Sequence, residues 1–143
     1  MKKIKHDKID AIFSKCVRER TNWTCEVCGD YYPEGKRQGL HCSHYHGRVI
    51  KSTRFCPWNC TAMCYGCHRK MESQPYKFTK WMESHISQVE FDKLVVRMNT
   101  LVRYREQDKR EMFEHFKSEL ERMQELRDRG ETGRLEFSAW KMP

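Results

Sequence analysis

The apolar residues near the N-terminus recur with helical spacing, whereas those in the middle of the chain do not. One stripe at positions i, i+3, i+4, i+7 and i+8 predicts an amphipathic helix over residues 7–20 and consists of Ile9, Ile12, Phe13, Cys16 and Val17. Residues 21–63 lack a helical period and contain turn-like Pro-Glu-Gly and Pro-Trp-Asn sequences. We therefore expect short strands and loops there, with residues 39–45 as a strand, followed by a helix over about 64–71.

The C-terminal half returns to helical periodicity. A short apolar stripe begins after Pro75, a stronger one covers residues 91–102, and a long charged helix is predicted over about 105–129, before Gly130. These helices could fold back on the N-terminal half as a hairpin. They could also pair between chains, although the coiled-coil spacing of the long helix lasts only about two heptads.

The length of 143 residues supports one compact domain, or a small core with a helical appendage. We expect an α+β protein with a compact part over residues 1–74 and a helical region over 75–143, ending in a polar tail, 131–143, that is either disordered or docked. Only 38% of the residues are hydrophobic. Such a chain usually needs a further source of stability, and its eight cysteines suggest one.

The sequence argues against a membrane or exported protein. No run approaches the roughly 18 apolar residues of a membrane span. The basic start is followed by more charged residues instead of the apolar core of a signal peptide. We therefore expect a cytoplasmic protein, in which cysteines are metal ligands more often than disulfides.

The net positive charge comes entirely from the first half. Residues 1–70 contain 14 Lys and Arg against 6 Asp and Glu, whereas residues 71–143 contain 14 of each. All eight cysteines also lie in the basic half. A basic segment indicates a polyanionic partner, most simply nucleic acid, although solubility alone could also explain the charge.

Two C-x2-C pairs predict a structural zinc site. Cys25 and Cys28 form the first pair, and Cys64 and Cys67 form the second. Four thiolates complete the tetrahedral shell of a structural zinc ion, and closing so large a loop would offset the small core. Four buried or redox-active thiols are the alternative. The other cysteines are expected to be packing residues, with a second metal pair at Cys56-x3-Cys60 as the alternative.

Between the zinc pairs lies a group of residues suited to phosphodiester hydrolysis. His41, His44 and His46 fall within six residues of one another, and Asn59 and His68 follow. A metal-dependent hydrolytic site needs a neutral imidazole to take a proton from water and ligands that hold a cation against phosphate. Taken alone, a strand histidine more often pairs with a backbone carbonyl.

In these residues the sequence resembles the HNH endonucleases, which have the ββα-metal fold, and most closely the phage NinG (Rap) recombination nucleases. The resemblance covers about residues 10–69. It rests on residues 10–20, Cys25-x2-Cys28-Gly29, His44-Tyr-x2-Arg48, Thr53-Arg54-Phe55, Asn59-x8-His68 and Cys64-x2-Cys67.

The resemblance implies a metal-dependent DNA endonuclease of a bacterium or a phage-infected cell. His44 would be the general base, Asn59 would orient it, and His68 would bind a catalytic Mg²⁺ or Mn²⁺. Many HNH enzymes carry a metal-binding Asp where this chain has Ser43. His41 or His46 could replace that ligand, and His41 is preferred because it faces the same side of a strand as Ser43. The NinG pattern usually has Asn at the position of His68.

The implied partner is DNA, including branched or nicked DNA. Arg48, Lys51 and Arg54 are the candidate phosphate contacts beside the site. A homodimer through the C-terminal helices would let the enzyme cut two strands symmetrically. A nicking or homing-type HNH endonuclease on duplex DNA and a non-catalytic, zinc-stabilised DNA-binding module are the alternatives.

Overall fold

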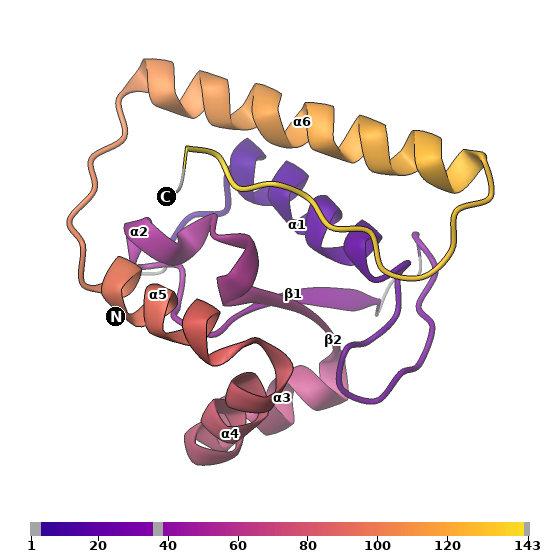
Figure 1. Ribbon diagram of the computed structural model, residues 1–143, viewed down its shortest axis with the longest axis horizontal. Helices are drawn as coiled ribbons and strands as arrows, with labels where there is room; N and C mark the ends of the chain where they lie inside the picture. The colour runs from indigo at the N-terminus through magenta and orange to yellow at the C-terminus, as the bar shows by residue number, and fades with distance from the viewer. Residues whose placement is uncertain (1–3, 36–38, 142–143) are drawn as a thin grey trace.

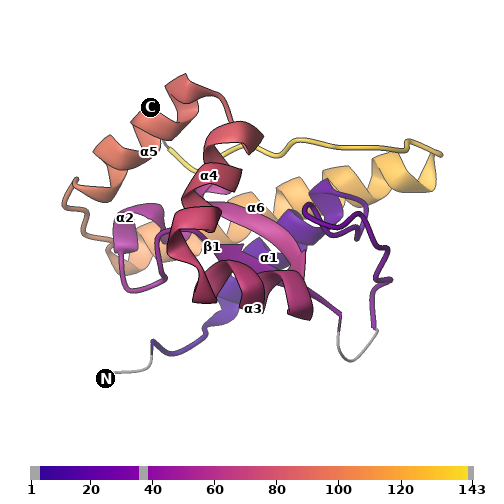
Figure 2. The ribbon, with the colours of Figure 1, turned by 90° about the horizontal axis from the view of Figure 1, so that it is seen from below.

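A computed structural model describes residues 4–35 and 39–141 and has an α+β architecture. Within these residues, a two-stranded antiparallel sheet is surrounded by six α-helices and one short 3₁₀ helix. The sheet lies between α1 (Lys8–Arg20) on one side and α3 (Tyr65–Ser73) with α4 (Pro75–His85) on the other (Figure 1). Figure 2, viewed from below, shows the same layers with α3 and α4 in front.

Helix α1 forms where the apolar stripe predicted it. The side chain of Asp7 accepts hydrogen bonds from the backbone N–H groups of Ile9 and Asp10, and the Asp10 carboxylate accepts one from the Asp7 N–H. This capping box satisfies N–H groups that have no partner within the helix. The residues of the stripe that reach the core are Ile9, Phe13, Cys16 and Val17.

Two strands and the following helix occupy the middle of the chain. Strand β1 (Leu40–His44) pairs antiparallel with β2 (Cys60–Cys64), with Leu40 opposite Cys64 and His44 opposite Cys60. Helix α3 follows β2 directly. The connection between the strands contains α2 (Lys51–Arg54) and the 3₁₀ helix η1 (Pro57–Asn59). The predicted strand and the helix after Cys64 are therefore both confirmed.

The C-terminal helices share the core of the N-terminal part. After α5 (Gln88–Met98), the long helix α6 (Glu106–Asp128) packs along α1, and the rings of Phe13 and Phe116 are 5.0 Å apart (Figure 1). The apolar residues on this face of α6 are all buried: Met112, Phe116, Leu120 and Met123. The helices thus fold back on the N-terminal part, but α6 pairs with α1 instead of forming a hairpin with α5. Because α1 covers it, this apolar stripe is not available for pairing between chains.

Residues 131–141 of the C-terminal tail are docked, and they run back along α1 (yellow in Figure 1). The Leu135 N–H donates to the Arg20 carbonyl oxygen at 2.9 Å. Phe137 is buried, with its ring 5.9 Å from that of Phe13. Over the described part of the chain, none of the helices is long and apolar enough to cross a membrane.

Candidate functional site

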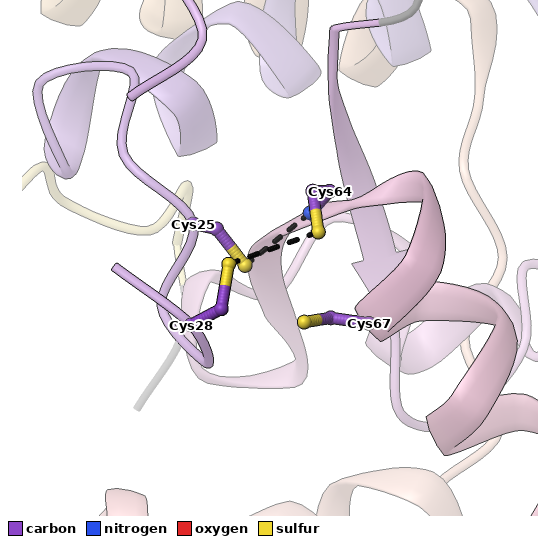
Figure 3. A group of neighbouring side chains, drawn as sticks. All are labelled: Cys25, Cys28, Cys64 and Cys67. Atoms are coloured by element: carbon purple, nitrogen blue, oxygen red, sulfur yellow. Dashed lines mark hydrogen bonds between the residues drawn. The ribbon is translucent and has the colours of Figure 1, made fainter. Parts of the chain in front are cut away.

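The two C-x2-C pairs come together in one cluster (Figure 3). The sulfur atoms of Cys25, Cys28, Cys64 and Cys67 all lie within 4.8 Å of one another, and those of Cys28 and Cys64 are 3.9 Å apart. Four sulfurs about 2.3 Å from a single zinc ion are about 3.8 Å apart at the corners of a tetrahedron. The cluster can therefore hold a structural metal ion such as zinc.

Local backbone geometry brings the first pair to the second. Gly29, directly after Cys28, has φ +80°, a value that favours glycine, and its N–H donates to the Cys25 carbonyl oxygen at 3.0 Å. The backbone N–H of Cys64 donates to the Cys25 sulfur at 3.3 Å. Although burial raises it, the pKa of Cys64 is lowered to about 7 because donors from Cys67 point at its sulfur. This thiol is thus poised to lose its proton to a metal.

A buried carboxylate holds the first cysteine pair in place. The Glu26 N–H donates to the Ala62 carbonyl oxygen, and the Ala62 N–H donates to Glu26 Oε2 at 2.6 Å. His85 Nε2 and Arg134 NH1 contact Glu26 Oε1 at 2.8 and 2.9 Å, and Arg20 is 3.7 Å from Oε2. Burial would raise the pKa of Glu26, but the hydrogen bond from His85 and the charge of Arg20 hold it at about 2. The loop is therefore tied to β2, α4, α1 and the tail at one point.

Three of the four predicted histidines, His41, His44 and His68, line an open cavity of about 460 Å³. Strand β1 contributes His41 and His44, and α3 contributes His68 and Glu72. The α1 segment and the loop after β1 supply the other polar walls, which include Asp10, Ser14, Arg18 and Arg48. Because the cavity has walls from both α1 and α3, it is bordered by residues from both faces of the sheet.

On the α3 side of the cavity, two imidazoles meet. The Nδ1 atoms of His41 and His68 are 3.1 Å apart, and His68 Nε2 is 2.9 Å from Glu72 Oε1. A carboxylate only accepts hydrogen bonds, so Nε2 of His68 carries the proton and Nδ1 carries a lone pair. Burial lowers the pKa of His41.

On the α1 side, His44 is held as a neutral imidazole. Its Nε2 is 2.9 Å from the Arg54 carbonyl oxygen, which can only accept, so Nε2 donates and Nδ1 carries the lone pair. Burial lowers the pKa of His44 to about 4, despite the opposing hydrogen bond to Arg54. A neutral imidazole with a free lone pair is the form that a general base requires.

Asn59 acts on the backbone next to the site. It is fully buried, and its Oδ1 accepts from the His46 N–H at 2.8 Å. Its Nδ2 donates to the carbonyl oxygens of His46 and Thr53 at 2.8 and 3.0 Å. These bonds fix the loop after β1 through the backbone of His46, two residues after His44. They are made to backbone groups and not to the His44 side chain.

The two alternative replacements for the missing Asp ligand are separated by the fold. His41 contacts His68, whereas His46 is not among the residues that line the cavity, and its Nε2 is buried without a hydrogen-bond partner. Ser43 is almost fully buried, and its Oγ is also without a partner.

The three candidate phosphate contacts differ in their surroundings. Arg48 lines the cavity and lies 3.6 Å from Asp10. Arg54 donates to both carboxylate oxygens of Asp10, from Nε at 3.0 Å and from NH2. Lys51 is exposed on α2 and outside the cavity wall. Both arginines are thus paired within the chain, since Arg48 NH2 also donates to the Ile4 carbonyl oxygen at 3.1 Å. Arg48 nevertheless keeps 31% of its side chain exposed, against 14% for Arg54, so Arg48 and Lys51 are the more accessible to an external anion.

Sequence reasoning missed Glu72, Asp10 and a second cluster. Glu72 lies four residues after His68 on one helix face, a spacing that could have been noticed. The ligand atoms of Cys42, His44 and Cys60 all lie within 4.8 Å of one another. Both cysteines were expected to be packing residues, and the alternative metal pair joined Cys60 to Cys56, which is not in this cluster. Burial raises the pKa of the Cys60 thiol well above its usual range.

Comparison of the chain with models of known protein families, with curated proteins and with solved structures found no match. The function is therefore inferred from the site itself.

Proposed function

We propose that the protein is a metal-dependent DNA endonuclease of the HNH type, with a ββα-metal core formed by β1, β2 and α3. The observation that carries the proposal is the approach of His41 to His68, whose Nδ1 atoms are 3.1 Å apart in a cavity that His44 also lines. The order of two antiparallel strands followed by a helix supports the same proposal.

His41 and His68 would hold the catalytic cation. Two nitrogens each about 2.1 Å from one ion are about 3.0–3.4 Å apart at octahedral to tetrahedral angles, which fits the observed separation. Glu72 would fix the ring of His68, as carboxylates commonly do for metal-bound histidines. When bound, the cation polarises the scissile phosphate and stabilises charge on the leaving 3′ oxygen. Because Mg²⁺ strongly prefers oxygen ligands, this site favours Mn²⁺ over Mg²⁺.

His44 would act as the general base. Its Nδ1 lone pair accepts a proton from water, and the hydrogen bond from Nε2 to the Arg54 carbonyl holds the ring and stabilises the imidazolium that forms. Asn59 would position His44 indirectly, by fixing the backbone of His46. Cleavage in this way gives 5′-phosphate and 3′-hydroxyl ends.

The cysteine cluster would bind a structural zinc ion that ties the loop after α1 to β2 and α3. Its four thiols form a closed ligand set with no position for substrate, which is typical of structural zinc. Because Cys67 lies on the same helix as His68 and Glu72, which line the cavity, the zinc ion would also hold this wall of the cavity in place.

DNA is the proposed substrate because the net positive charge of the chain comes entirely from residues 1–70, which also form most of the cavity. Arg48 and Lys51 would contact phosphates, and Arg54 would shape the cavity through Asp10. The resemblance to recombination nucleases favours branched DNA in a bacterial or phage-infected cell.

The test is cleavage of supercoiled plasmid, a four-way junction and linear duplex, each with Mg²⁺, Mn²⁺ or EDTA. We expect Mn²⁺-dependent cleavage of the junction that EDTA abolishes and that His44→Ala eliminates without loss of DNA binding. His115→Ala is the matched control, since His115 lies on α6 outside the cavity. Cleavage of plain duplex alone would favour a nicking or homing enzyme. Binding without cleavage under every condition would leave a zinc-stabilised DNA-binding module.

A further inference from the structure

The cluster of Cys42, His44 and Cys60 lies on the face of the sheet that is turned toward α1. Alternation along β1 puts Cys42 and His44 on the same side, and the register places Cys60 directly opposite His44. The ring of His44 is 6.4 Å from that of Phe13 on α1, which identifies this side. Two sulfurs and one imidazole nitrogen are thus brought within 4.8 Å of one another by strand pairing alone.

The cluster borders the cavity through two of its members, whereas Cys60 is buried behind them, and it has a free lone pair. Cys42 and His44 line the cavity, so an ion could enter from there, and water in the cavity could complete its coordination. The proton on Nε2 of His44 is committed to the Arg54 carbonyl, which leaves Nδ1 to bind a metal. A backbone carbonyl that orients a ligating histidine in this way is a common feature of metal sites.

We propose that Cys42, His44 and Cys60 form a second metal site, which takes Zn²⁺ or a similar thiophilic ion and inhibits the enzyme. Two thiolates, one imidazole and an open position form a recognised zinc ligand set, whereas Mg²⁺ does not bind thiolates. On binding, the thiol protons of Cys42 and Cys60 are released to solvent and the ion takes their place. The ion also binds the lone pair of His44, so His44 can no longer take a proton from water. The inhibition rests on the proposed function, but the metal site does not.

Cobalt is the probe for the site, because thiolate-bound Co²⁺ absorbs light and the occupied zinc cluster does not. Zinc-loaded full-length protein is titrated with Co²⁺ under reducing conditions. We expect the wild type to bind one further equivalent with a thiolate-to-cobalt absorption band, and Cys42→Ser to lose that band. Cys16→Ser is the matched control, because the Cys16 thiol donates to the Phe116 carbonyl outside both clusters. It should titrate as the wild type does.

The second measurement is inhibition of Mn²⁺-dependent cleavage by added Zn²⁺. We expect Cys42→Ser to need about tenfold or more zinc for the same fractional inhibition, with each protein compared with its own zinc-free rate. A wild type without the cobalt band, or a band that persists in Cys42→Ser, overturns the site. If no cleavage is found in any protein, the cobalt titration still decides the site, and only the inhibition is overturned. Unchanged zinc sensitivity in Cys42→Ser likewise overturns the inhibition.

Discussion

His68 is oriented from two sides: its Nε2 is 2.9 Å from Glu72, one helical turn further along α3, and its Nδ1 is 3.1 Å from His41 on β1. Glu72 is largely exposed, so the pair adds little to stability, but it selects the tautomer in which Nδ1 faces His41. The helix turn thus holds the imidazole in the orientation that the proposed metal site requires.

Glu72→Gln should raise the Mn²⁺ concentration needed for half-maximal cleavage by about 10- to 100-fold, because the amide no longer holds the His68 ring as firmly. His68→Ala should abolish cleavage at any practical metal concentration. The measurement is the initial rate as a function of Mn²⁺, with Glu121→Gln on the exposed surface of α6 as the control. An unchanged metal dependence in Glu72→Gln would argue against this role.

Cys25→Ser and Cys67→Ser should each lower the melting temperature and the zinc content together, since each removes one of four ligands. Cys16→Ser, outside the cluster, should keep its zinc. Zinc is measured by elemental analysis and unfolding by circular dichroism. Full zinc content in both cluster variants would refute the four-cysteine site.

Asp10→Asn should destabilise the protein by about 2–4 kcal/mol at neutral pH, because it removes the buried carboxylate that pairs with Arg54 and leaves the half-exposed Asp7, 3.7 Å away, as the remaining counter-charge. Burial would raise the pKa of Asp10, but the hydrogen bond from Arg54 lowers it below its ordinary value of 3.8. A lowered pKa stabilises the fold above that ordinary value and ceases to do so as the pH falls through the lowered one.

The difference in unfolding free energy between the wild type and Asp10→Asn should therefore be constant above about pH 5 and shrink below about pH 4. Urea unfolding at several pH values measures it. Asp128→Asn, at the exposed end of α6, is the control and should show no such loss. A difference that grows on acidification would contradict the assignment.

Lys51→Ala and Arg48→Ala should each weaken DNA binding and reduce by about one the slope of log affinity against log salt, as expected for the loss of one phosphate contact. Arg54→Ala should mainly lower stability, since its guanidinium is bound to Asp10. Fluorescence anisotropy over a range of salt concentrations measures the slopes, with Lys117→Ala on α6 as the control. Equal slopes in all four variants would contradict the proposed DNA-binding surface.

The elements with a strong local signal could be predicted from the sequence. The long helix expected over 105–129 is α6 (Glu106–Asp128), and the strand expected over 39–45 is β1 (Leu40–His44). The spacing within the two C-x2-C pairs predicted a cluster of four thiols, and the four cysteines do lie together. In each case, a period or a motif within a few residues determines the outcome.

The relationships between distant segments could not be predicted in the same way. The stripe on α6 indicates which face is buried, but not that α1 covers it. The pairing of Asp10 with Arg54 joins residues 44 apart. Cys60 lies opposite His44 because of the strand register. That register could not be predicted, because the connection of fifteen residues between the strands is too long to determine it. The catalytic roles, DNA binding and a homodimer stay predictions.

The packing of α1 against α6 has a consequence for the order in which the protein can mature. The Cys16 thiol on α1 bonds to Phe116, one hundred residues later. During synthesis at about 5–20 residues per second, the apolar face of α1 therefore stays exposed for several seconds until α6, which packs against it, has left the ribosome. A polypeptide interrupted before α6 would keep that face uncovered, so ribosome-bound nascent chains should attract chaperones until α6 has emerged.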